Sequence, residues 1–139
     1  MKNLLRKTSI LMLSLCMCSP VVVSTFPTTS VEAADKNIEN AYRQAKMYLQ
    51  TMPFSKKGLI DQLSSNFGGK FTVEQAKAAV NMLEDNKEVN WKKQAVKAGK
   101  QYLDMMGMSR QGLIDQLSSD YGSKFTVKQA TYAADKLGL

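Results

Sequence analysis

Apolar residues recur at steps of three and four between residues 38 and 52, with polar residues between them. This spacing is typical of an amphipathic α-helix, and Pro53 ends it because proline has no amide hydrogen to donate. The predicted buried face consists of Ile38, Ala41, Tyr42, Ala45, Tyr48, Leu49 and Met52. The same spacing returns in the second half of the chain at Trp91, Ala95, Tyr102, Leu103 and Met106, followed by Gly107.

An exact internal repeat lies between and after these helices. The octapeptide Gly58-Leu-Ile-Asp-Gln-Leu-Ser-Ser65 returns unchanged at residues 112–119, an offset of 54 residues. The same offset maps Tyr48-Leu49 onto Tyr102-Leu103 and residues 71–73 onto residues 125–127. The chain therefore contains two copies of one structural unit.

A second helix is predicted within each copy of the octapeptide. It begins at Ser55, or Ser109 in the second copy, because serine is a favoured helix N-cap. Its inward-facing residues are Leu59, Ile60 and Leu63, with Leu113, Ile114 and Leu117 as counterparts. We expect the helix to stop near Gly68 and Gly122, since glycine suits the left-handed turn that follows many helices.

A third helix has the clearest start signal in each copy. Thr72-Val-Glu-Gln75 and Thr126-Val-Lys-Gln129 are capping boxes, in which the Thr hydroxyl and the Gln side chain each satisfy a free backbone amide. Phe71 and Phe125 precede them as hydrophobic staples. The inward residues are then Ala76, Ala79, Val80 and Leu83, matched by Ala130, Ala133, Ala134 and Leu137. These small side chains favour close helix packing.

The sequence thus predicts an all-α fold of two tandem three-helix, helix-turn-helix-like repeats, at residues 35–85 and 89–139. The polar segment 84–90 is interpreted as a short solvated connection. A unit of this size has little core of its own, so we expect the two copies to pack on each other, with Trp91 at their junction.

Residues 1–33 are predicted to be a secretory signal peptide. Lys2, Arg6 and Lys7 provide a basic start, an apolar stretch follows from residue 10 to residue 23, and small residues allow cleavage between Ala33 and Ala34. The apolar run is too short for a membrane span.

Both cysteines lie inside this leader. Lipidation at Cys16 or Cys18 requires a small residue just before the cysteine, but Leu15 and Met17 stand there. We therefore expect an exported protein that begins at Ala34, is secreted or associated with the cell surface, and has no lipid anchor. Such a product has no cysteine and hence no disulfide or thiolate nucleophile.

Composition narrows the range of functions. The chain is 44% hydrophobic and 22% charged, which is ordinary for a globular protein, and it has no histidine. Histidine-based triads and most catalytic zinc sites are thereby excluded. We expect no enzyme activity, no cofactor, no metal and no small-molecule substrate. The net charge of +7 becomes +5 without the leader, so the exported protein stays basic.

Six polar residues at matching positions form the candidate partner-binding surface. They are Lys46 and Lys100, Lys70 and Lys124, and Gln62 and Gln116. A solvated, solubilising face is the alternative interpretation of the lysines. Asp61 and Asp115 are interpreted as solvent-facing helix residues and not as an acid pair. Tyr48, Tyr102 and the methionines at positions 47, 52, 105, 106 and 108 are expected in core and edge packing, with an adaptable protein interface as the alternative for the methionines.

These motifs carry a resemblance to a known family. Tyr48-Leu, then Phe54-Ser-x-x-Gly-Leu-Ile-x-Gln-Leu-x-Ser, then Gly-x-x-Phe-Thr-x-x-x-Ala, with Asn90-Trp91 opening the second copy, resemble the repeat of the Ltp family of host cell surface-exposed lipoproteins. The resemblance covers almost the whole exported chain, twice. It implies a fold of tandem helix-turn-helix-like repeats and a role in superinfection exclusion. Proteins of this family are often encoded by prophages of Gram-positive bacteria.

The resemblance implies that the chain binds another protein, such as a phage component that delivers DNA, and thereby stops DNA injection. Binding of an anionic cell-envelope polymer is a second hypothesis, because a basic protein attracts polyanions. DNA binding through the helix-turn-helix-like unit is a third, weakened by the predicted export and by the absence of an Arg-rich edge on the third helices.

Overall fold

The computed structural model describes residues 29–139, so most of the predicted leader, including Cys16 and Cys18, lies outside the described residues. Within that range the chain forms six α-helices and no strand. The helices are α1 (Thr29–Thr51), α2 (Lys56–Ser64), α3 (Val73–Asp85), α4 (Trp91–Met105), α5 (Arg110–Ser118) and α6 (Val127–Lys136). The prediction of an all-α fold with two three-helix repeats is confirmed. Helix α1 begins earlier than Ile38 and includes Ala33 and Ala34 in its first turns.

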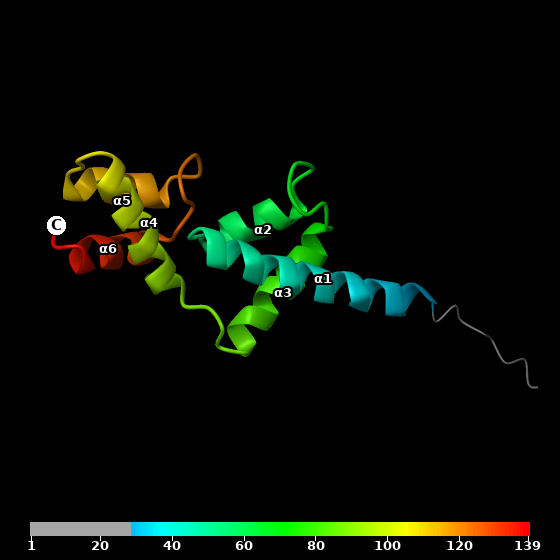
Figure 1. Cartoon of the computed structure of the whole chain (residues 1–139). Coiled ribbons are helices and arrows are strands. Elements are labelled where there is room, and N and C mark those ends of the chain that lie inside the picture. The colour runs from blue at the N-terminus through cyan, green and yellow to red at the C-terminus, as the bar shows by residue number, and fades with distance from the viewer. Residues whose placement is uncertain (1–28) are drawn as a thin grey trace, which may run out of the picture.

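The two repeats lie next to each other and are joined at one end by the segment after α3 (Figure 1). In each repeat the first helix packs on the third, and the second also packs on the third. Every extensive helix–helix contact in the described chain lies within one repeat. None of the described helices is both long and apolar enough to span a membrane.

Small residues bring the first and third helices of each repeat close together, as the sequence predicts. Ala41 and Ala45 on α1, like Ala76 and Ala79 on α3, are fully buried. In α4 the residue equivalent to Ala45 is Gly99, where an added Cβ would lie only 2.7 Å from Leu137 Cδ1. The second repeat therefore has an even smaller residue at this crossing, and an alanine there would have to displace the end of the Leu137 side chain.

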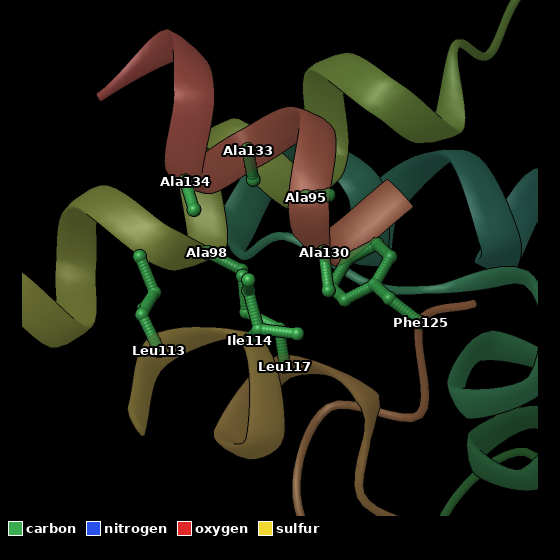
Figure 2. Packing of buried hydrophobic residues seen from close by; sticks show 9 residues of the cluster. All are labelled: Ala95, Ala98, Leu113, Ile114, Leu117, Phe125, Ala130, Ala133 and Ala134. Carbon is green, nitrogen blue, oxygen red and sulfur yellow. The ribbon is translucent and has the colours of Figure 1, made fainter. Parts of the chain in front are cut away.

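Each repeat has its own hydrophobic core. Figure 2 shows the core of the second repeat, where α4, α5 and α6 contribute Ala95, Ala98, Leu113, Ile114, Leu117, Ala130, Ala133 and Ala134, with Phe125 just before α6. A separate cluster around Leu59, Leu63 and Val80 fills the first repeat. The copies meet at Trp91 and through two ion pairs between α2 and the α5–α6 turn, while each closes a core of its own, because alanine-lined crossings let three short helices pack by themselves. Trp91 does lie at the junction, packed against the first repeat's core.

The predicted N-caps are all present. Ser55 Oγ and Ser109 Oγ accept the amides of Gly58 and Gly112, at 3.0 and 3.1 Å. Both capping boxes before α3 and α6 are complete, with the Thr side chain and the Gln side chain each bonded to the backbone. These local signals fix where the second and third helices of each repeat begin.

The turn between the second and third helices differs from its prediction. Gly68 and Gly122 are not left-handed; the left-handed residues are Lys70 and Lys124, with φ of 56° and 57°. Glycine is needed instead for close approach, because an added Cβ at Gly68 would lie 1.9 Å from the backbone oxygen of Gln62. At Gly122 the corresponding distance, to the backbone oxygen of Gln116, is 2.1 Å.

Most of the methionines face solvent, contrary to the predicted packing role. Met52 and Met106, the last members of the predicted helix faces, are exposed, and so are Met47 and Met105. Met108 alone of the five packs against a core, that of the second repeat. Helices α1 and α4 end at Thr51 and Met105, so Met52 and Met106 lie beyond the helix ends and outside the core.

The connection between the repeats is tied to α1 and is not simply solvated. Tyr42 Oη donates to Glu88 Oε2 at 2.8 Å, and Lys46 Nζ lies 3.2 Å from Glu88 Oε1. Asn86 Nδ2 donates to Tyr42 Oη at 3.2 Å. These contacts fix the direction in which the chain leaves the first repeat.

Candidate partner-binding surface

A cleft of about 730 Å³ lies between the two repeats. Its lining comes from α2, α3 and the start of α4 on one side and from the α5–α6 turn and the start of α6 on the other. The lining includes the apolar side chains of Ile60, Val73, Trp91 and Phe125 and the charged side chains of Lys57, Asp61, Asp120 and Lys124. Because both repeats contribute, this cleft does not exist in a single repeat.

The apolar part of the cleft is built around Trp91. Its indole Nε1 donates to Glu84 Oε1 at 2.6 Å, which fixes the ring orientation beside α3. Ile60 is half-buried and Val73 is exposed, so both present carbon surface to an incoming group. Tryptophan beside aliphatic side chains in a concave site is typical of protein-binding surfaces.

Two ion pairs connect the repeats beside the cleft. Lys124 Nζ lies 2.5 Å from Asp61 Oδ2, and Lys57 Nζ lies 2.5 Å from Asp120 Oδ1. The hydrogen bond from Lys57 lowers the pKa of Asp120, and the same contact raises the pKa of Lys57. Both pairs are partly or largely exposed, so they orient the repeats more than they stabilise them.

The predicted site residues do not come together on one surface. Lys124 lines the cleft, whereas Lys70, its counterpart in the first repeat, is exposed and lies outside the cleft lining. Lys46 pairs with Glu88, and that hydrogen bond raises the pKa of Lys46. Lys100 pairs with Asp104 one turn along α4, at 2.9 Å.

The two glutamines bind inside their own repeats. Gln62 Nε2 donates to Tyr48 Oη at 3.5 Å, and Gln116 Nε2 donates to Tyr102 Oη at 3.3 Å. These matching contacts join the second helix to the first, so we interpret both glutamines as structural. Their candidate role in partner binding has no support from this geometry.

Sequence reasoning placed Trp91 at the junction but missed the cleft, together with Ile60 and Val73. It also passed over Phe67 and Tyr121, which are fully exposed at equivalent positions of the two turns. The repeat offset already aligned these two aromatic residues and was the available signal. Within residues 29–139, no cluster of acidic residues has the arrangement of a metal site.

Comparisons with known proteins point to one family. The sequence model of a family described as "Host cell surface-exposed lipoprotein" matches residues 36–83 and again residues 90–137. A solved structure of Ltp, a superinfection exclusion protein from the Streptococcus thermophilus temperate phage TP-J34, is similar at 35% identity with a TM-score of 0.61. The similarity covers 72% of this chain and 94% of that one. A comparison with curated proteins found no match.

Proposed function

Because the chain belongs to the family of host cell surface-exposed lipoproteins, we propose that it is an Ltp-like superinfection exclusion protein that acts by binding. The observation that carries this proposal is the match of the family model to both repeats, together with a similar solved exclusion protein. The proposed activity is stoichiometric and needs no catalysis.

The proposed mechanism is contact with a protein component through which an incoming phage delivers its DNA. The cleft supports this mechanism because it combines apolar surface at Trp91, Ile60 and Val73 with a charged rim. An apolar centre inside a polar rim is the usual anatomy of a protein–protein interface. A partner held there blocks passage of DNA without any change to the phage receptor.

The test of the function follows adsorption and DNA entry separately in a sensitive host that expresses the chain. We expect phages to adsorb normally while phage DNA inside the cells falls sharply relative to cells that lack the protein. Normal DNA entry across several phages, with surface display confirmed, would overturn the proposal.

A matched pair of variants tests the cleft. Val73→Asp places a charge in the cleft, whereas Val127→Asp makes the same change at the equivalent exposed residue of the second repeat, outside the cleft. Both residues are the first of their helices, where an acidic residue is well tolerated. We expect Val73→Asp alone to weaken exclusion. Equal exclusion by the two variants would remove the cleft from the mechanism.

We place the mature protein outside the cell, at the surface, as the family description supports. The leader sequence supports cleavage between Ala33 and Ala34 in preference to lipidation at Cys16 or Cys18. Mass spectrometry of the exported protein should then find an N-terminus at or near Ala34 with no lipid. A diacylated cysteine would instead make the protein membrane-tethered.

Binding of an anionic envelope polymer has less support. Several of the lysines that would attract a polyanion, including Lys46, Lys57, Lys100 and Lys124, already have a carboxylate partner. Paired lysines leave less positive potential for a polymer. Salt separates the two hypotheses, because screening weakens polymer binding far more than a protein interface with an apolar centre.

A further inference from the structure

Two aromatic side chains stand fully in solvent at equivalent positions of the two repeats. Phe67 lies in the α2–α3 turn and Tyr121 in the α5–α6 turn, with relative exposures of 101% and 103%. A single exposed apolar residue needs no explanation, but here the full exposure of a large aromatic ring occurs twice with the same local geometry. Neither ring belongs to the core of its repeat.

The turns that carry these rings are built in the same way and are closed by hydrogen bonds to the backbone. The amides of Phe67 and Tyr121 donate to Ser65 Oγ and Ser119 Oγ, each at 3.1 Å. Lys70 and Lys124 then close the turns, each donating its amide to the backbone oxygen of the same serine at 3.2 Å. Because hydrogen bonds already order the backbone of each turn, binding does not have to order it, which lowers the entropy cost.

Both turns project to the same side of the molecule in the view of Figure 1, at the top, where the α2–α3 turn is green and the α5–α6 turn is orange. Ser65 at the start of the first turn and Gly122 in the second line the same surface pocket, so one partner can meet both turns at once. Two contacts made by one molecule strengthen each other through effective concentration.

We propose that Phe67 and Tyr121 are paired anchors, one from each repeat, that insert into apolar pockets on the protein partner that this chain binds. The inference rests on the proposed function and extends it to a second surface beside the cleft. Aromatic residues are enriched at protein interfaces, and tyrosine is among the residues that most often carry the binding energy there.

A protein fits these turns better than a lipid surface does. Asp120 stands immediately before Tyr121, and its side chain is 72% exposed in its ion pair with Lys57. Insertion of the ring among anionic lipid headgroups would bring this carboxylate into the same negative region, and because Lys57 already neutralises it, the pair offers those headgroups no net positive charge. In a protein interface the same pair forms part of the polar rim around the buried ring.

The test uses the full chain displayed on host cells and compares phage DNA entry for two double variants. Phe67→Ser with Tyr121→Ser removes both anchors, and Met47→Ser with Met105→Ser removes one exposed apolar side chain per repeat away from the turns. We expect the first variant to admit about tenfold more phage DNA than the unmodified chain, and the second to exclude like the unmodified chain. Melting temperatures of both should stay unchanged, because the substituted side chains are exposed.

The outcomes separate this inference from the function on which it rests. If the unmodified chain excludes phage and the variant without the two rings excludes equally well, the proposal of paired anchors is wrong and the proposed function stands. If the unmodified chain does not exclude, the proposed function fails and the inference falls with it. Sedimentation with vesicles of phosphatidylglycerol and phosphatidylcholine tests the lipid alternative. Vesicle binding that disappears with the two rings would overturn the protein anchor in favour of a membrane contact.

Discussion

Trp91 donates its indole N–H to the carboxylate of Glu84 across the junction between the repeats, at 2.6 Å. The same carboxylate accepts from Lys56 Nζ at 2.6 Å, so one side chain on α3 connects to α2 and to α4. Burial by itself would raise the pKa of Glu84, but the hydrogen bonds from Lys56 and Trp91 outweigh it and lower the pKa. The ionised carboxylate is therefore the form that holds the junction together.

Acid is expected to loosen Trp91 before the repeats unfold. The pKa of Glu84 is lower in the folded protein than in the unfolded chain, so its contribution is complete above the unfolded value of about 4.3 and is lost as the pH falls through the folded value. Fluorescence of Trp91, the only tryptophan, should therefore change below about pH 4. Circular dichroism followed in parallel distinguishes this local change from unfolding.

The Glu84→Gln variant provides the control for that titration. Its amide oxygen still accepts from Trp91 but does not titrate, so the acid-induced change in fluorescence should disappear. Glu74→Gln, at an exposed site in the first turn of α3, should leave the titration as it was. An unchanged acid titration in Glu84→Gln would show that another group controls the environment of Trp91.

The ion pair between Lys124 and Asp61 should affect the arrangement of the repeats more than their stability. Lys124→Glu places two carboxylates side by side, and we expect the radius of gyration from small-angle scattering to increase. Adding Asp61→Lys to that variant restores opposite charges and should return the radius to its original value. The melting temperature should change little, because each repeat keeps its own core. If the radius of gyration stays the same in both variants, contacts other than this ion pair hold the repeats together.

Gly122 should not tolerate alanine, although its φ is ordinary. The new Cβ would lie 2.1 Å from the backbone oxygen of Gln116, so the turn must shift, at a cost of about 1–3 kcal/mol in the free energy of unfolding. Gly107→Ala is the matched control, because nothing lies within 4 Å of an added Cβ there. Denaturant unfolding measures both variants, and equal stability of the two would contradict the close approach in the turn.

Local signals in the sequence predicted the helices well, and they failed where the environment of a residue is set by the other repeat. The octapeptide is identical in both copies, yet Ile114 is buried in its core while Ile60 is half-buried and lines the cleft. Asp61 pairs with Lys124, whereas the equivalent Asp115 accepts from Gln111 one turn away, at 2.8 Å. Identical residues cannot report these differences, because the ion pair forms only where one repeat meets the other, and the burial of Ile114 depends on the core that surrounds it in its own repeat.

The turn shows a second limit of prediction from sequence. Glycine near a helix end usually predicts a left-handed residue, but here Lys70 and Lys124 adopt that conformation. The backbone of the turn folds back so closely onto the second helix that Gly68 and Gly122 are needed where no Cβ fits. Only three-dimensional contact distinguishes these two reasons for a glycine.

Separate cores predict that damage to one repeat leaves the other folded. Leu63 and Leu117 are fully buried, each within the cluster of its own repeat, so truncation to alanine should cost about 2–5 kcal/mol at either site. The two losses should add in the double variant, because the sites share no packing partner. Asp115→Asn, on the solvent side of the same helix as Leu117, should change stability little.

Hydrogen exchange resolved by residue is the decisive measurement. In Leu117→Ala, protection should fall across α4–α6 and persist in α1–α3. Equal loss of protection in both repeats would show that they unfold as one cooperative unit, despite their separate cores.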